Sequence, residues 1–206
     1  MLITIHPKNP EIKKIESVVD CLKKGGVIIY PTDAVYSIGC DLMNARAVER
    51  VAKIKGIAVE KANFSLMCSE LAQAANYVKP FDTNTFKLLK KALPGPFTFI
   101  LEASSTVPKI FKNKKKTIGI RIPDNKIIHE IVKLLGNPLI ATSVHDDDEV
   151  IEYTTDPELI YEKYYTTIDL LVNGGYGHNT ATTIVDLSNN DLEIIREGLG
   201  DIKKFL

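Results

Sequence analysis

Short apolar runs alternate with amphipathic stretches along most of this chain. Residues 27–30 read Val-Ile-Ile-Tyr between a Gly pair and Pro31, which is typical of a buried strand. A second apolar stretch, residues 35–40, returns to the core after a polar turn. Comparable runs predict strands at 2–5, 64–67, 97–101, 117–122, 138–142, 168–172, 182–187 and 192–196.

Apolar positions three and four residues apart predict helices between these strands. We expect Asn9 to be the N-cap of the first helix, with Pro10 at its first position and Gly25-Gly26 after its end. Asn44 is expected to cap the second helix. Further helices are predicted at 71–75, 83–93, 125–135 and 157–163.

The alternation of strands and helices predicts an α/β fold, while the last two strands look like a hairpin. We therefore expect a twisted, mixed parallel and antiparallel sheet flanked by helices. No repeat, low-complexity tract or linker interrupts the chain, so residues 1–206 are interpreted as a single domain.

The amino-acid composition of the chain limits the classes of function that the protein can have. Lys plus Arg equals Asp plus Glu at 26 each, so any nucleic-acid contact must come from a local patch. Cys21, Cys40 and Cys68 are widely spaced, which supports neither a zinc site nor a disulfide scaffold. No signal peptide and no apolar run long enough to cross a bilayer is recognised. A cytoplasmic location without a membrane partner is the expectation.

Polar residues follow the apolar runs at several strand ends. They are Thr32-Asp33, Arg121, Thr142-Ser143, Thr182-Thr183 and Arg196. If these ends converge, they form a cleft lined by hydroxyl and guanidinium groups, which suits a phosphate or carboxylate ligand. Lys53 and Lys55 add positive charge near the end of the second helix. The alternative is that the lysines only complement the helix end and the arginines are surface partners.

The segment 109–116 is the most concentrated basic run, with five lysines around Phe111. Lysine neutralises phosphate without reading base sequence, so contact with a nucleic-acid backbone is one interpretation. A solvated loop is the other. The acidic run 145–149 lacks the spacing of an EF-hand, and no protein ligands for a metal are assigned.

Six motifs in order resemble those of the YrdC family, whose members include threonylcarbamoyl-AMP synthases. Residues 31–41, PTDAVYSIGCD, resemble its signature P-T-[DE]-[TA]-V-Y-G-L-G-C-D, with Ser37 in place of the usual Gly. The other five stretches are LPGPFTFIL, IGIRIP, ATSVH, TATTIVDL and IIREG. The match extends over nearly the whole chain.

The resemblance implies a sheet folded around a large, concave, positively charged cavity. It implies a nucleotidyltransferase that joins L-threonine, bicarbonate and ATP into threonylcarbamoyl-adenylate, for modification of adenosine 37 in transfer RNA. ATP with Mg²⁺ is then a substrate, and no prosthetic group is expected. By the same resemblance Thr32, Arg121 and Thr182 bind the threonine, whereas Lys55, Ser143 and Arg196 face the nucleotide and carboxyl groups.

Two of the motifs depart from the synthase pattern. The K-x-R motif reads Lys55-Gly56-Ile57, and the S-x-N motif reads Ser143-Val144-His145. These departures, and both ends of the chain, resemble the YciO branch of the family. We therefore expect an activity that is weak or altered. The alternative is a protein that binds double-stranded RNA or transfer RNA in the same cavity without catalysis, aided by Lys112, Lys114, Lys115 and Lys116.

Overall fold

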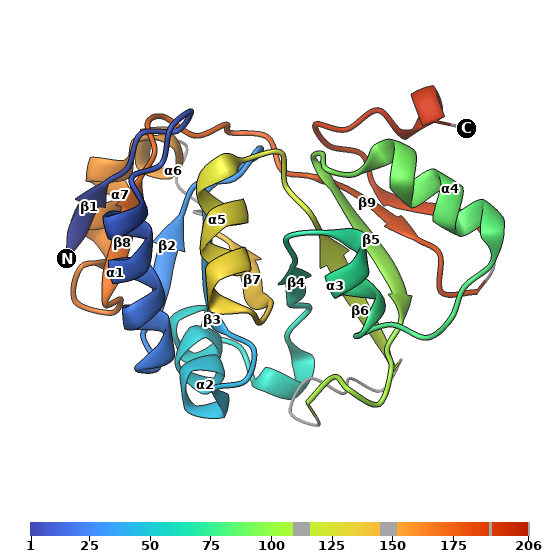
Figure 1. The fold of residues 1–206 in the computed structure, drawn as a ribbon, viewed down its shortest axis with the longest axis horizontal. Coiled ribbons are helices and arrows are strands. Elements are labelled where there is room, and N and C mark those ends of the chain that lie inside the picture. The colour runs from blue at the N-terminus through green and yellow to red at the C-terminus, as the bar shows by residue number, and fades with distance from the viewer. Residues whose placement is uncertain (109–115, 145–151, 190, 206) are drawn as a thin grey trace.

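Strands from both ends of the chain meet in one sheet. The structure is a computed structural model, which describes residues 1–108, 116–144, 152–189 and 191–205 (Figure 1). Within these residues the strands are β1 Leu2–Thr4, β2 Ile28–Tyr30, β3 Ser37–Asp41, β4 Ser65–Met67, β5 Phe97–Glu102, β6 Thr117–Arg121, β7 Leu139–Ser143, β8 Leu170–Asn173, β9 Thr183–Asp186 and β10 Glu193–Arg196. Their order across the sheet is β1-β8-β2-β3-β7-β4-β6-β5-β9-β10.

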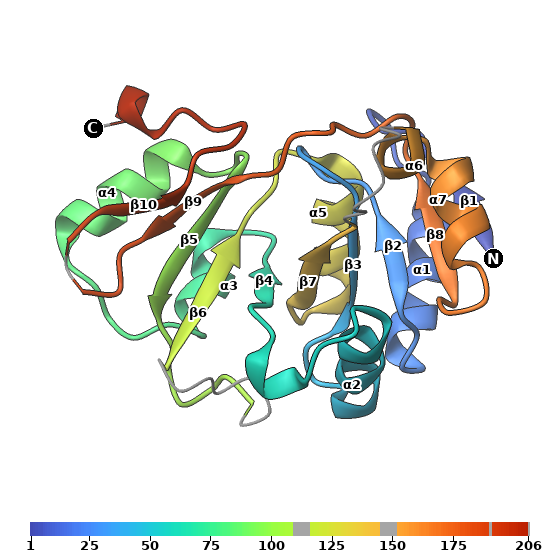
Figure 2. The same cartoon turned by 180° about the vertical axis from the view of Figure 1, so that it is seen from behind.

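The sheet is mixed, as the sequence predicts. β8 runs parallel to β1 and β2, β4 to β6, and β5 to β9. The remaining pairs are antiparallel, including the hairpin of β9 and β10. Seen from behind, β2, β3 and β7 lie on one side of the short strand β4, and β6, β5 and β9 lie on the other (Figure 2).

Helices flank the sheet in two groups. The helices are α1 Ile12–Lys23, α2 Ala45–Ile54, α3 Leu71–Ala75, α4 Thr83–Ala92, α5 Lys126–Leu135, α6 Glu152–Thr155 and α7 Pro157–Tyr164, with 3-10 turns at Val59–Lys61 and Ile202–Phe205. α1 and α5 pack side by side over Tyr30, Met67 and Leu139 (Figure 1). α2, α4 and α7 contribute instead to the larger apolar cluster, which contains Ile38, Leu66 and Phe99. None of the helices formed by the described residues has the length and apolar character needed to cross a bilayer.

The predicted helix caps have different outcomes. Asn44 does cap α2, because its side chain accepts the Ala47 backbone N–H at 3.0 Å. The prediction that Asn9 caps α1 is wrong, since the helix begins at Ile12 with Glu11 as N-cap. The reason is a competing turn: the His6 imidazole accepts the backbone N–H of Asn9 at 3.1 Å, so this residue belongs to the turn before the helix.

Small side chains occupy one face in the centre of the sheet. The registers place Ser37 opposite Ser143, and place Ala141 and Gly119 on either side of Ser65. The residues between them in sequence are large, and in a strand they point to the opposite face. Those large residues belong to the core and include Ile38, Leu66, Ile120 and Ile140. The contrast in size leaves a hollow on the small-residue face.

Candidate functional site

A cavity of about 510 Å³ lies on the small-residue face of the sheet. Seven strands contribute to its wall: β3, β7, β4, β6, β5, β9 and β10. Residues that follow β2, α2, β7 and β8 complete it. The lining residues are Val35, Ser37, Lys55, Asn63, Ser65, Thr98, Arg121, Ala141, Thr142, Ser143, Val144, Asn179, Ala181, Thr182, Ile184 and Arg196.

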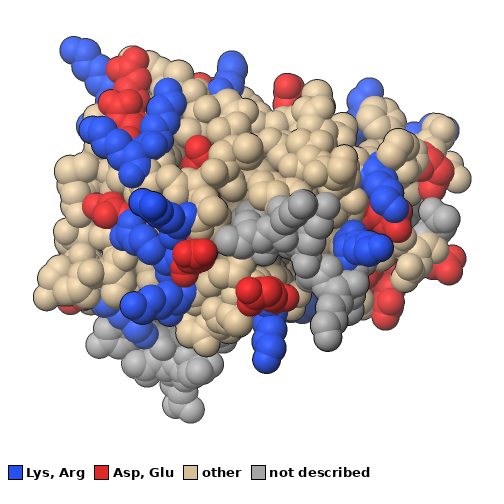
Figure 3. All heavy atoms as spheres, turned by 90° about the horizontal axis from the view of Figure 1, so that it is seen from below, with Lys and Arg blue, Asp and Glu red and all other residues tan. Residues whose placement is uncertain are grey.

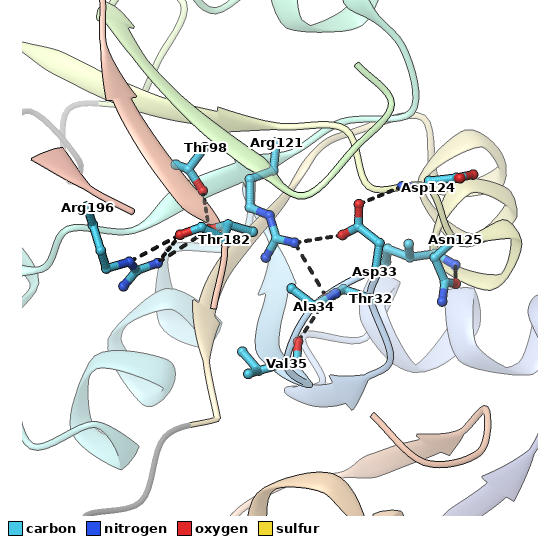
Figure 4. A network of polar contacts seen from close by, with 11 residues as sticks. Thr32, Asp33, Ala34, Val35, Thr98, Arg121, Asp124, Asn125, Thr182 and Arg196 are labelled. Atoms are coloured by element: carbon cyan, nitrogen blue, oxygen red, sulfur yellow. Dashed lines mark hydrogen bonds and ion pairs between the residues drawn. The ribbon is translucent and has the colours of Figure 1, made fainter. Parts of the chain in front are cut away.

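Arg121 is held in the cavity wall by a buried ion pair. Its Nη2 donates to Asp33 Oδ1 at 3.0 Å, and the two side chains are only 5% and 9% exposed (Figure 4). The other Asp33 oxygen accepts the Asp124 backbone N–H at 3.0 Å. Burial lowers the pKa of the Arg121 guanidinium and the Asp33 carboxylate opposes this effect. Because an Arg pKa is normally far above neutrality, Arg121 stays a cation.

Thr32 lies behind Arg121 and does not line the cavity. Its hydroxyl accepts the Ala34 backbone N–H at 3.0 Å and donates to the Val35 carbonyl at 2.8 Å. Arg121 Nη2 reaches the same oxygen at 3.5 Å. The Thr32 hydroxyl is therefore used to stabilise its own turn. Its remaining contact is with the guanidinium of Arg121.

Arg196 and Thr182 come together at the other end of the site. Arg196 Nε and Nη2 donate to the Thr182 carbonyl at 3.1 and 2.8 Å (Figure 4). The hydroxyls of Thr182 and Thr98 are 2.9 Å apart, so the parallel pairing of β5 with β9 joins residues distant in sequence. Burial lowers the pKa of the Arg196 guanidinium as well.

Lys55 and Ser143 meet on the third side of the cavity. Lys55 follows directly after α2, and its Nζ donates to the Ser143 carbonyl at 3.1 Å. Ser143 is the last residue of β7. Three cations from separate elements, Lys55, Arg121 and Arg196, thus surround one hollow, which is the convergence that the strand-end pattern predicts.

Two further positions singled out from the sequence, Ile57 and Lys116, are described and do not line the cavity. Ile57, at the place of the synthase arginine, is 41% exposed and is not part of the lining. Lys116 is exposed on the chain that enters β6. The predictions for Lys112, Lys114, Lys115 and His145 concern positions outside the described residues.

Among the lining residues without a predicted role, Ser37, Ser65 and Thr98 are the polar ones that lie in strands. Each alternates with large apolar neighbours along its strand, and that period of two is the sequence signal that would have placed them on one face. Ser37 is fully buried, and its hydroxyl has no hydrogen-bond partner within the described part of the chain.

The charge of the lining favours an anionic ligand. No Asp or Glu is present among the described residues that form the wall, whereas Lys55, Arg121 and Arg196 are cationic. The described part of the chain also contains no cluster of three His, Cys, Asp or Glu side chains that could hold a metal ion. Cationic and hydroxyl donors of this kind bind phosphate or carboxylate oxygens and do not coordinate a cation.

Comparison with known proteins gives consistent matches. The sequence model of the Sua5/YciO/YrdC family, described as "telomere recombination", matches residues 20–198. The chain is 39% identical to the protein YciO of Escherichia coli (strain K12) over 98% of this chain and 97% of that one. The crystal structure of E. coli YciO superposes with a TM-score of 0.91 over 100% and 99% of the two chains.

Two further relatives extend the comparison to synthases. A threonylcarbamoyl-AMP synthase of Coxiella burnetii (strain RSA 493) is 32% identical over 80% of this chain and 87% of its own. The structure of P. abyssi Sua5 complexed with L-threonine shares the fold, with a TM-score of 0.86 at 23% identity over 96% of this chain and 57% of that one.

Proposed function

Because this chain belongs to the Sua5/YciO/YrdC family, we propose that its cavity binds ATP beside a small amino acid and catalyses adenylate formation of the threonylcarbamoyl-AMP synthase type. The single observation that carries the proposal is the grouping of Lys55, Arg121 and Arg196 around one hollow. Relatives at 32% identity bear the synthase name, which supports a related chemistry.

The proposed reaction needs positive charge more than it needs an acid or a base. Threonine and bicarbonate give a carbamate with loss of water. A carbamate oxygen then attacks the α-phosphorus of ATP, and the bond to the β-phosphate oxygen breaks to release pyrophosphate. Attacking group, transferred group and leaving group are all anionic, so fixed cations lower the barrier by stabilising charge and by positioning the reactants.

The cations of this site are already held in place. Arg121 is fixed by Asp33, Arg196 by the Thr182 carbonyl and Lys55 by the Ser143 carbonyl. Fixed donors need little reorganisation when a ligand arrives, which is the condition for electrostatic stabilisation of a transition state. We propose that Arg121 and Thr182 bind the amino acid, with Thr32 positioning Arg121, and that Lys55, Ser143 and Arg196 face the nucleotide. Mg²⁺ enters with ATP, as part of the substrate.

Release of pyrophosphate tests this function. Purified protein should form pyrophosphate from ATP and Mg²⁺ only when L-threonine and bicarbonate are both present. Lys55→Ala should lower kcat/KM about 10- to 100-fold, because a charge-assisted contact to phosphate is lost. Lys13→Ala, which removes an exposed lysine of α1, serves as the matched control and should behave like the wild-type protein. Threonine-independent turnover, or equal rates in the two variants, would contradict the proposal.

A second candidate function is binding of transfer RNA or double-stranded RNA. In the view from below, Lys and Arg side chains gather on one side of the molecule, with some Asp and Glu among them (Figure 3). Arg50 and Lys53 of α2 and Lys163 of α7 line a separate hollow of about 550 Å³. Ile57 also removes a cation expected of a synthase. A sequence-independent contact with the RNA backbone would use such surface cations.

The RNA candidate predicts a steep dependence on salt. Affinity for transfer RNA should fall linearly with the logarithm of salt concentration, and replacing Lys114, Lys115 and Lys116 by Ala should reduce the slope by about two to three. A filter-binding titration at several salt concentrations gives both the affinity and its slope against the logarithm of salt concentration. If binding of transfer RNA is absent or is insensitive to salt, the RNA-binding function is contradicted. That result does not affect the proposed enzyme function.

A further inference from the structure

The hydroxyl of Ser37 is the least expected feature of the cavity. Ser37 is fully buried in β3 and lines the cavity, yet its Oγ has no hydrogen-bond partner among the residues that the structure describes. The motif that residues 31–41 resemble has a glycine at this position. A hydroxyl buried without a partner destabilises a folded protein, so its presence here calls for a partner that binds from the cavity.

The neighbours of Ser37 define what that partner can be. Ser37 is directly opposite Ser143, whose carbonyl holds the Lys55 ammonium at 3.1 Å. On its other side Ser37 is opposite Tyr30, the last residue of β2, and the turn after Tyr30 carries the Asp33 that holds Arg121. Ser37 therefore lies between the anchor of one cation and the anchor of another.

Arg121, which also lines the cavity, has a second donor that is not used. Its Nη2 is engaged by Asp33, but its Nε is buried and has no partner among the described residues. The side chain extends from β6 toward the β2–β3 turn, as Figure 4 shows. A hydroxyl can donate or accept, but the guanidinium N–H can only donate, and the three cations of the wall repel a cationic group. The two groups together therefore match the oxygens of an oxyanion.

We propose that the Ser37 hydroxyl donates a hydrogen bond to an oxyanion of the bound ligand and thereby helps to set which ligand this cavity accepts. The oxyanion is a phosphate oxygen of the nucleotide or the carboxylate of the amino acid. This inference rests on the proposed function for the identity of the ligands. The proposed hydrogen bond is a contact that a glycine at position 37 cannot make. Ser37 is then a specificity-determining residue.

A hydrogen-bonding role and a purely steric role predict different results for two variants. Ser37→Ala removes the hydroxyl and keeps the Cβ atom, whereas Ser37→Gly removes both. If the hydroxyl binds an oxyanion, both variants lose affinity about 10- to 100-fold, as expected for a hydrogen bond to a charged group. If Ser37 only occupies space, Ser37→Ala binds like the wild-type protein and only Ser37→Gly differs.

Isothermal titration calorimetry with separate probes distinguishes the two sources of the oxyanion. ATP with Mg²⁺ and inorganic pyrophosphate report a phosphate contact, and L-threonine reports a carboxylate contact. Weaker binding of either class by both variants supports the inference and assigns the hydroxyl to that class. Unchanged binding by Ser37→Ala overturns it. Failure of the wild-type protein to bind any probe overturns the proposed function itself, so the two failures are distinguishable.

The stability of the free protein gives an independent readout. Because the hydroxyl has no partner in residues 1–108, 116–144, 152–189 and 191–205, the melting temperature of ligand-free Ser37→Ala should equal or exceed that of the wild-type protein. Ser65→Ala is the comparison, since its hydroxyl donates to the Ala141 carbonyl at 3.4 Å and its removal should give no gain. A clear drop in melting temperature for Ser37→Ala would assign the hydroxyl a structural role and overturn the inference.

Discussion

Arg121→Met is expected to lower the free energy of unfolding by about 3–5 kcal/mol, because it leaves the Asp33 carboxylate buried without its counter-ion. The Asp33 side chain is only 9% exposed, and the Asp124 backbone N–H remains as the donor to its other oxygen. Met is similar to Arg in length, so the loss reflects the uncompensated charge more than a cavity. Urea unfolding at neutral pH measures the change directly.

A double-mutant cycle tests the cause of that loss. Asn at position 33 keeps a carbonyl oxygen for the Asp124 N–H but carries no charge. Asp33→Asn combined with Arg121→Met should therefore recover more than half of the lost stability. A loss below about 1 kcal/mol in the single variant would mean that the pair behaves like a solvated surface ion pair, and the buried-pair interpretation would fail.

Arg121→Lys separates the role of Arg121 in stability from its role in binding. A lysine keeps the positive charge beside Asp33 but lacks the second set of donors that a guanidinium offers to an oxyanion. The unpartnered Nε of Arg121 is one of those donors. This variant therefore distinguishes the ion pair, which the charge alone can retain, from ligand binding, which needs the guanidinium.

The local elements of the fold could be predicted because their causes are local. The apolar run at 27–30 and the stop at Pro31 define β2, and the side chain of Asn44 caps the helix that follows it. Asn9 shows the limit of this reasoning. It has the residue type of an N-cap, but it belongs to a turn in which the His6 imidazole accepts its backbone N–H, and the helix begins only at Ile12. The residue type alone does not decide between a cap and a turn of this kind.

The assembly of the cavity depends on pairings that no local pattern contains. β1 pairs with β8, and β5 pairs with β9, although each pair is far apart in sequence. The second pairing brings Thr98 to 2.9 Å from Thr182 and completes the cavity wall near Arg196. The polar residues at the ends of the predicted strands indicated that hydroxyl groups and cations would converge. They could not show that the Thr32 hydroxyl serves the turn, nor that Ser37 is buried without a partner.

Gly39→Ala should lower the free energy of unfolding by about 3 kcal/mol or more, because the two strands that carry the cavity floor cannot stay in register around an added methyl group. Gly39 is buried in β3 opposite Ala141 of β7. A Cβ atom at position 39 would overlap the backbone carbonyl oxygen of Ile140, and backbone in the middle of a sheet has little freedom to move. Thermal and urea unfolding of the purified variant measure the loss.

Gly119→Ala is the matched control for Gly39→Ala, since it makes the same chemical change on the same face of the sheet. Its Cβ would lie 3.2 Å from the side chains of Ser65 and Thr98, which can shift by a few tenths of an ångström, so we expect a loss below about 1.5 kcal/mol. Separation of β3 from β7 also displaces the Ser143 carbonyl that holds Lys55, so Gly39→Ala should weaken ATP binding even where the variant stays folded. Equal losses in the two variants would show that the close approach of Gly39 to the Ile140 carbonyl has no special importance.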